Sequence, residues 1–95
     1  MGLLDRLKRK KEDEASRITS LLQSGRFVDG KVVDVETDAD GTIIQVYYSY
    51  DVSGVQYESS QLLSPEQQQN KNKYIPGATL TVRYDPRRPA NSIVP

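Results

Sequence analysis

The chain contains neither cysteine nor histidine. The absence of cysteine excludes disulfides, thiolate nucleophiles and thiolate metal sites. The absence of histidine removes the side chain that most often serves as a general base at neutral pH and that most often binds transition metals. We therefore expect a protein that is not an enzyme, with no catalytic residue, no cofactor and no metal site.

Long apolar runs are missing as well. The apolar stretches are pairs and triplets, far from the roughly 20 residues that a transmembrane helix needs. A secretory signal places its charges before an apolar run of about 7–15 residues. Here Leu3 and Leu4 come first and the basic run at 8–11 follows. The sequence therefore predicts a cytoplasmic protein.

Basic and acidic residues number 13 each, so the overall charge favours no class of partner. The first 17 residues are nevertheless basic and the rest mildly acidic. Three leucines of the leader, residues 1–13, can share one side of a helix among basic side chains, which suits contact with an anionic membrane surface. The candidate membrane-contact residues are Leu3, Leu4, Leu7, Lys8, Arg9, Lys10 and Lys11. The alternative is a solvated, disordered leader over residues 1–13.

The rest of the chain, residues 14–95, has the size of one small domain. Helical spacing predicts a helix near 14–24 that packs Ile18, Leu21 and Leu22 on a sheet. Gly25 follows it, and glycine is a usual residue just after a helix. The run at 64–73, in which Pro65 is the only apolar residue, is predicted to be a disordered loop.

From Arg26 the apolar residues recur with a period of two, which is typical of strands. The pattern predicts strands over 26–36, 44–51, 55–63, 80–84 and 92–94. Gly30 indicates a bulge or a strong bend, and Ser53-Gly54 a tight turn. The expected fold is mainly β, a five-stranded curved sheet or small barrel of the OB or SH3-like kind, with an N-terminal α-helix. The pattern leaves an open sheet and a closed barrel as alternatives.

The C-terminal third carries the most specific motif of the chain. Tyr74-x-Pro76-Gly77 is followed by Leu80-x-Val82-x-Tyr84-Asp85-Pro86-x-x-Pro89 and by Ile93. This order resembles the C-terminal half of a bacterial family, domain of unknown function 3592. Gly30-x-Val32 and Gly54-x-x-Tyr57 are similar to the hairpin of that family, so the resemblance covers about residues 26–94. It implies a small all-β domain, often found beside membrane helices, with no established activity or site residues.

Tyrosines and arginines supply the candidate partner surface. Strand alternation sends Tyr47 to the face opposite Tyr48 and Tyr50, where an aromatic ring can contact a partner. Three arginines flank the ring of Tyr84 near the C-terminal end of the chain. The candidate residues are Tyr47, Arg83, Tyr84, Arg87 and Arg88. The plainer interpretation is cross-strand tyrosine packing, with the arginines paired to Asp85 or solvated.

Residues 36–41 imitate the first half of a calcium loop, but Tyr47 stands where the bidentate Glu belongs. A plain turn is therefore the better interpretation, because Asp and Gly are also common in hairpin turns.

We expect a non-catalytic interaction module that binds a protein partner through a face or edge of its sheet, held peripherally at the inner membrane by its first residues. The alternative is a nucleic-acid-binding β-barrel that uses Arg83, Arg87 and Arg88. The acidic side chains of the same domain disfavour that alternative, because they repel a polyanion. The sequence leaves monomer and weak homodimer open.

Overall fold

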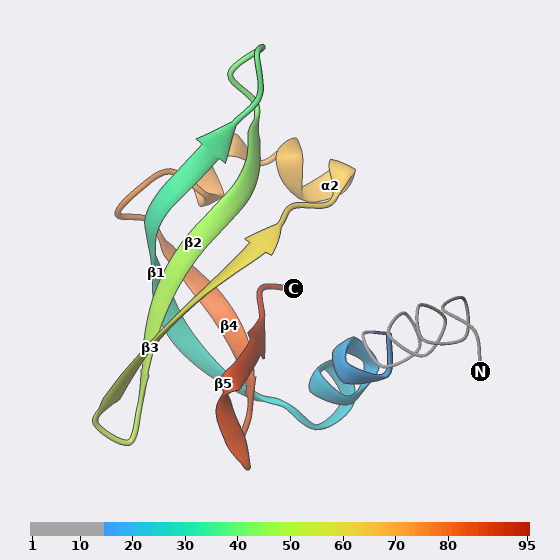
Figure 1. Ribbon diagram of the computed structural model, residues 1–95, viewed down its shortest axis with the longest axis vertical. Helices are drawn as coiled ribbons and strands as arrows, with labels where there is room; N and C mark the ends of the chain where they lie inside the picture. The colour runs from blue at the N-terminus through green and yellow to red at the C-terminus, as the bar shows by residue number, and fades with distance from the viewer. Residues whose placement is uncertain (1–14) are drawn as a thin grey trace, which may run out of the picture.

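The computed structural model describes residues 15–95 (Figure 1). A helix over residues 15–24 leads into β1 (Arg26–Thr37), β2 (Ile43–Val52) and β3 (Val55–Leu62). Two short helical turns, α2 (Pro65–Gln68) and η1 (Lys71–Lys73), connect β3 to β4 (Thr79–Asp85) and β5 (Arg88–Ile93). The predicted leader and its candidate membrane-contact residues lie outside the described residues. In the part described, no helix is both long and apolar enough to cross a membrane.

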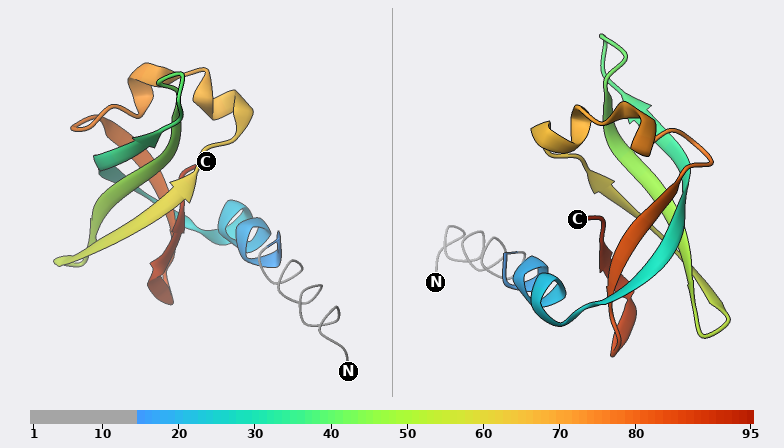
Figure 2. Two further views of the ribbon diagram at one scale, coloured as in Figure 1. Left: turned by 45° about the horizontal axis from the view of Figure 1, so that its top comes forward. Right: turned by 180° about the vertical axis from the view of Figure 1, so that it is seen from behind.

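The five strands form one antiparallel sheet in the order β3-β2-β1-β4-β5. The sheet curls until its two outer strands, β3 and β5, approach each other, which gives a nearly closed barrel (Figures 1 and 2). The prediction of a mainly β, five-stranded fold with an N-terminal helix is confirmed. Of the two predicted alternatives, an open sheet and a closed barrel, the structure is closer to the barrel.

The core is built from alternate residues of β1, β2 and β4, as the period of two predicts. Val46, Tyr48 and Val82 are the most deeply buried. The ring of Tyr50 stacks between those of Tyr48 and Tyr57, with centroids 5.9 and 5.6 Å away. Loop residues complete the cluster, which contains Val32, Ile43, Val46, Tyr48, Tyr50, Leu63, Tyr74, Leu80, Val82 and Val94.

Gly30 lies inside the barrel, where β1 passes close to its neighbours. A Cβ at this position would meet the carbonyl oxygen of Ser49 at 2.7 Å and a methyl group of Val82 at 2.8 Å. Gly30 therefore permits a close approach of strands, as the predicted bend requires. The alternative prediction of a bulge there is wrong, because the register of β1 shifts between Val32 and Asp34 instead.

Local interactions explain the two hairpin turns at the ends of β2. Ser53 and Gly54 both have positive φ, 52° and 82°, as a two-residue type I′ turn requires. In the other turn, Asp38 Oδ1 accepts hydrogen bonds from the backbone N–H groups of Asp40 (2.9 Å) and Thr42 (3.0 Å). The Asp38 carboxylate thus serves the turn itself.

The N-terminal helix contacts the barrel along a narrow line. Leu21 is buried, with 2% of its surface exposed, whereas Ile18 and Leu22 keep 37% and 46%. The prediction that all three pack on the sheet therefore holds for Leu21 alone. Gly25 follows the helix as predicted, and a Cβ there would lie 2.4 Å from the carbonyl oxygen of Leu21.

The prediction of a disordered loop over residues 64–73 is wrong, because α2 and η1 lie within this range. Ser64 and Gln67 make a capping box at α2: Ser64 Oγ accepts from the Gln67 N–H (3.2 Å) and Gln67 Oε1 from the Ser64 N–H (3.0 Å). The last strand also differs from the prediction. It begins at Arg88 and not at Ser92, so Pro89, Ala90 and Asn91 belong to β5.

Candidate partner-binding edge

The barrel has a seam where β3 and β5 face each other, since no ladder of backbone pairs joins these two strands. Every strand between them has a neighbour on both sides. An unpaired strand edge presents a row of backbone N–H and C=O groups that another chain can pair with. The seam is therefore the natural place to look for a binding site.

Side chains occupy the β5 side of the seam. Gln61 on β3 donates from Nε2 to the carbonyl oxygen of Val94 (2.7 Å) and accepts at Oε1 from the Val94 N–H (2.8 Å). This amide group replaces one backbone pair of a ladder. Gln67 Nε2, from α2, donates to the same carbonyl at 3.0 Å.

Two tyrosines of β2 reach β5 from inside the barrel. The hydroxyl of Tyr48 is hydrogen-bonded to Ser92 Oγ (2.8 Å), and Tyr50 donates to the carbonyl oxygen of Pro89 (2.5 Å). Burial of the Tyr50 phenol raises its pKa, which favours the protonated hydroxyl that donates this bond.

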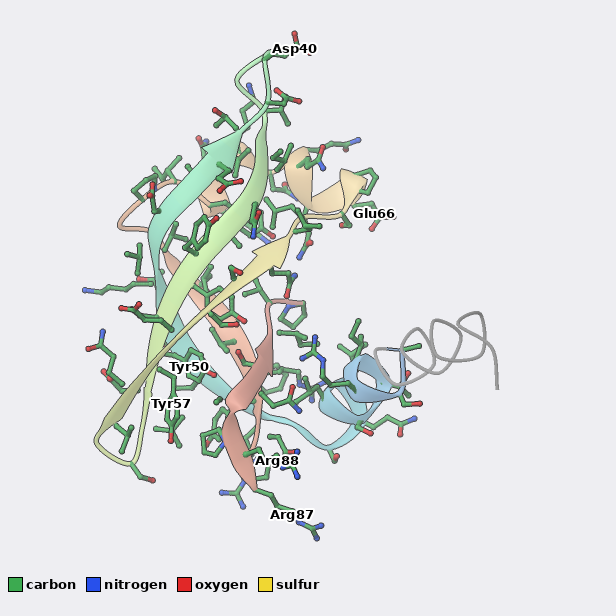
Figure 3. The ribbon with its side chains drawn as sticks, in the orientation of Figure 1. Asp40, Tyr50, Tyr57, Glu66, Arg87 and Arg88 are labelled. Atoms are coloured by element: carbon green, nitrogen blue, oxygen red, sulfur yellow. The ribbon has the colours of Figure 1, made fainter. Side chains whose placement is uncertain are left out.

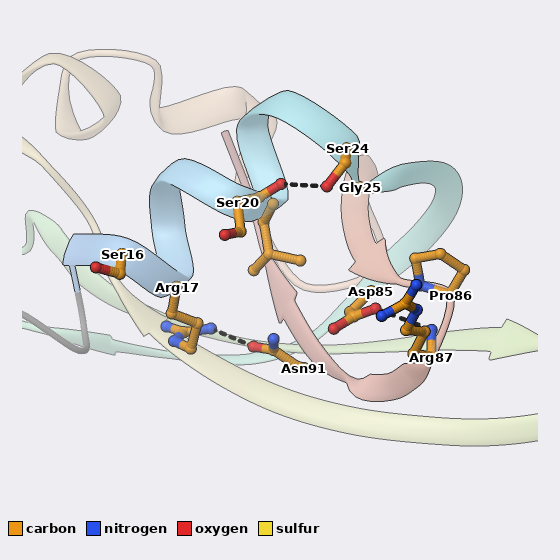
Figure 4. A pocket seen from close by; sticks show the side chains of 10 residues that line it. Ser16, Arg17, Ser20, Ser24, Gly25, Asp85, Pro86, Arg87 and Asn91 are labelled. Atoms are coloured by element: carbon orange, nitrogen blue, oxygen red, sulfur yellow. Dashed lines mark hydrogen bonds between the residues drawn. The ribbon is translucent and has the colours of Figure 1, made fainter.

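The helix meets β5 from outside. Arg17 Nη1 donates to Asn91 Oδ1 (2.7 Å) and to the carbonyl oxygen of Ser92 (3.3 Å). Beyond these bonds, Arg17 and Asn91 line a hollow of about 580 Å³ between the helix and the β4–β5 turn, together with Asp85 and Arg87 (Figure 4). The β5 edge is thus covered on both sides.

The β3 side of the seam is different, and its geometry follows from the β2–β3 register. The N–H of Leu63 donates to the carbonyl oxygen of Ile44 (2.8 Å), and the register from Gln45–Leu62 to Val52–Val55 runs without a shift. In an antiparallel pair, hydrogen-bonded and non-hydrogen-bonded positions alternate. The odd-numbered residues of β3 therefore bond to β2, and the even-numbered residues direct their N–H and C=O groups into the seam.

We define the β3 edge as these four even-numbered residues, Gln56, Glu58, Ser60 and Leu62. All four side chains are exposed. Among the described residues, 15–95, no hydrogen bond to their backbone groups is found. The β3 edge is thus an unpaired strand edge.

Two hollows flank the β3 edge. On the seam side a groove of about 930 Å³ runs between the end of β3, α2, β5 and the N-terminal helix. The partly exposed apolar side chains of Ile18, Leu22 and Leu62 line this groove. On the outer face of the barrel a shallower hollow of about 350 Å³ is lined by Val33, Tyr47, Glu58 and Ser60, among others. A strand placed on the β3 edge would lie between the two hollows.

The family model that describes a domain of unknown function, DUF3592, matches residues 24–95. The chain belongs to this family. The matched range contains all five strands of the DUF3592 barrel and both sides of its seam. No curated protein and no solved structure matches the chain.

Of the residues that the sequence predicted for a partner surface, Tyr47 lies beside the β3 edge. Its hydroxyl donates to Glu36 Oε1 at 2.6 Å. This hydrogen bond, with smaller contributions from desolvation and from the charges of Glu36 and Asp34, raises the pKa of Tyr47. Tyr47 thus presents a neutral, fixed ring on the outer face of the DUF3592 barrel.

Arg83 has a different position and role. Its Nη1 donates to the carbonyl oxygen of Leu22 in the last turn of the helix, and its guanidinium lies 4.3 Å from the centre of the Phe27 ring. A cation is favourable at a helix C-terminus and over an aromatic face. Its Nε is buried and has no hydrogen-bond partner among residues 15–95. Arg83 therefore holds the helix on the barrel.

The predicted surface is divided between two places. Arg83 is opposite Phe27 on β1, and Tyr47 is opposite Asp34, so about 23 Å of strand separates them at 3.3 Å per residue. Tyr84 is partly buried against the core. Arg87 and Arg88 project at the β4–β5 turn, at the opposite end of the barrel from Asp40 (Figure 3).

Sequence reasoning did not find Gln61, Glu58 or Ser60. Alternation shows which face of a strand a side chain occupies, but it carries no information on which strand is left at an edge.

The described residues contain no group of three or more acidic side chains placed to hold a metal ion.

Proposed function

We propose that the protein is a non-catalytic interaction module that binds a protein partner by strand addition at the β3 edge. The observation that carries this proposal is the asymmetry of the seam. Side chains bond backbone groups at the end of β5, whereas the backbone groups of Gln56, Glu58 and Ser60 have no partner in the described chain. In strand addition, backbone bonds supply affinity and alternating side chains supply specificity.

The energy available at this edge suits a regulated contact. A backbone hydrogen bond contributes about 0.5–1.5 kcal/mol net, so the edge alone supplies a few kcal/mol, which ordering of an extended segment partly offsets. Side chains in the two flanking hollows would supply the rest. The partner is therefore a segment that the groove and the outer hollow also recognise.

Proline at Ser60 tests the proposal selectively. The N–H of Ser60 points into the seam, so its loss removes no bond to β2 and blocks only an added strand. We expect affinity capture from the producing cells to return a partner with wild type and with Ser60→Thr, and to lose it with Ser60→Pro. Circular dichroism verifies that each variant is folded, and Gln56→Pro replaces Ser60→Pro if the latter is not. Capture of the same partner by all three proteins, or of none by wild type, would contradict the proposal.

We also propose that the basic leader brings the module to the inner membrane. The support is the run of four basic residues beside Leu3, Leu4 and Leu7. Each basic residue near an anionic surface contributes about 1 kcal/mol. We expect the full chain to sediment with anionic vesicles at low salt, and a chain that begins at Ser16 to stay in solution. Equal sedimentation of both chains, or none of the full chain, would contradict this role.

A further inference from the structure

The outer face of β1, β2 and β3 is acidic. Cross-strand neighbours share a face, and the register places Lys31, Ser49 and Glu58 in one row and Asp34, Tyr47 and Ser60 in the next. The exposed acidic side chains of this face are Asp29, Asp34, Glu36, Asp51 and Glu58. Within the described strands, β2 and β3 contain no basic residue, and Lys31 is the basic residue that β1 places among these carboxylates.

The groove on the opposite side of the β3 edge is of mixed character, and its lining includes the apolar side chains of Ile18, Leu22 and Leu62 among polar residues. A strand added to this edge would alternate, so residues opposite Glu58 and Ser60 would share the acidic face. Residues opposite Ser59 and Gln61 would face the groove, whose lining includes Ile18 and Leu22. The site therefore offers the carboxylate of Glu58 to one face of the added strand, with that of Asp51 one strand further away, and the aliphatic side chains of Ile18 and Leu22 to the other face.

We propose that the occupant of the β3 edge is an extended segment of a partner protein that alternates basic and apolar residues. The basic side chains pair with Glu58, and the apolar side chains enter the groove beside Ile18 and Leu22. This proposal rests on strand addition as the proposed function, and it adds the chemistry of the segment. Charge complementarity decides between occupants, because an acidic strand would set like charges beside Glu58.

The test uses three end-blocked peptides of about nine residues, a usual strand length. One alternates Lys and Val, one alternates Glu and Val, and one alternates Lys and Ser. Fluorescence anisotropy gives dissociation constants, and amide chemical shifts of the ¹⁵N-labelled full chain locate the site. We expect Lys–Val to bind at least about tenfold more tightly than either other peptide at low salt, where screening is weakest.

A charge reversal with a matched control assigns the preference to this face. Glu58→Lys should weaken Lys–Val binding about fivefold, because it replaces one favourable cross-strand pair by a repulsive one. Asp40→Lys makes the same change of charge at the exposed β1–β2 turn (Figure 3) and should leave the affinity unchanged. Equal weakening by both variants would reduce the preference to overall charge and overturn the inference.

The outcomes separate the inference from the proposed function. If no peptide shifts the amides of Gln56, Glu58 and Ser60, or if Ser60→Pro binds as well as wild type, strand addition itself is wrong. If peptides bind at this edge but Glu–Val binds as tightly as Lys–Val, strand addition stands and the inference about charge is overturned. If Lys–Ser equals Lys–Val, the groove has no part in recognition and the inference about the apolar face is overturned.

Discussion

The two edges of the sheet differ in what bonds to their unpaired backbone groups. β3 and β5 are the two edge strands of the sheet, and each has backbone groups that no neighbouring strand pairs. On the β5 side, three carbonyl oxygens accept hydrogen bonds from the side chains of Gln61, Tyr50 and Arg17. In residues 15–95, no hydrogen bond to the backbone groups of the even-numbered residues of β3 is found. Because side chains from three directions converge on β5, closure at this side is built into the fold. The β3 edge is therefore the open side of the seam, and it is the side to which we propose that a partner binds.

The largest effect is expected inside the barrel at β5. Ser92→Ala leaves the hydroxyl of Tyr48 buried without its hydrogen bond, since Tyr48 is only 1% exposed. An unsatisfied buried polar group costs about 1–3 kcal/mol. The same substitution on the β3 edge, Ser60→Ala, should change the free energy of unfolding by less than about 0.5 kcal/mol. Urea unfolding measures both, and equal effects would show that the two edges do not differ.

Removal of the helix anchor should have a smaller effect. Arg83→Ala deletes the hydrogen bond to the Leu22 carbonyl and the contact with Phe27. A loss of about 1–2 kcal/mol is expected from a charged hydrogen bond and a cation–π contact. Arg87→Ala, at the exposed turn, should be nearly neutral. Thermal unfolding gives the two values, and a neutral Arg83→Ala would mean that the helix covers β5 without this anchor.

Removal of the Gln61 side chain, which bridges β3 and Val94, should have the next smaller effect. Gln61→Ala removes both hydrogen bonds to Val94, and we expect about 1 kcal/mol of destabilisation because water can reach this part-buried site. The Val94 amide should then exchange with solvent faster. Gln56→Ala serves as the control, since Gln56 is exposed on the β3 edge. Unchanged exchange at Val94 would contradict the role of Gln61 as a bridge.

The smallest effect concerns the outer face beside the β3 edge. Glu36→Gln should lower the pKa of Tyr47, because the hydrogen bond to Glu36 is the main cause of its raised value. Asp34→Asn should lower it less, since the charge of Asp34 is the last of the contributions. A phenol whose pKa is raised on folding adds stability that is present below the unfolded pKa and lost as the pH rises through the folded pKa. Titration of the Tyr47 ring by NMR decides the order, and a larger shift in Asp34→Asn would contradict it.

Sequence predicted the strands well, because alternation at Val46, Tyr48 and Tyr50 reports a face directly. It placed Tyr47 outside for the same reason. The capping box at Ser64 and Gln67 was also visible as a pattern, and it would have indicated the helical turn α2 in place of a loop.

The seam itself could not be read from sequence. Gln61 and Val94 lie 33 residues apart, and their contact exists only because the sheet curls. Arg83 was grouped with Arg87 by proximity along the chain, but its side chain is directed to the helix by a docking that no local pattern encodes. Edges and bridges depend on which strands become neighbours, and that is a property of the whole fold.

Amide hydrogen exchange along β3 in the free protein is the direct test of whether the β3 edge is unpaired. Residues 55, 57 and 59 bond to β2, whereas Gln56, Glu58 and Ser60 point into the seam. We expect slow exchange for the first set and for Val94, and fast exchange for the second set, in strict alternation. Protection of Gln56, Glu58 and Ser60 equal to that of their neighbours would show that the β3 edge is already paired and has no free backbone groups for a partner.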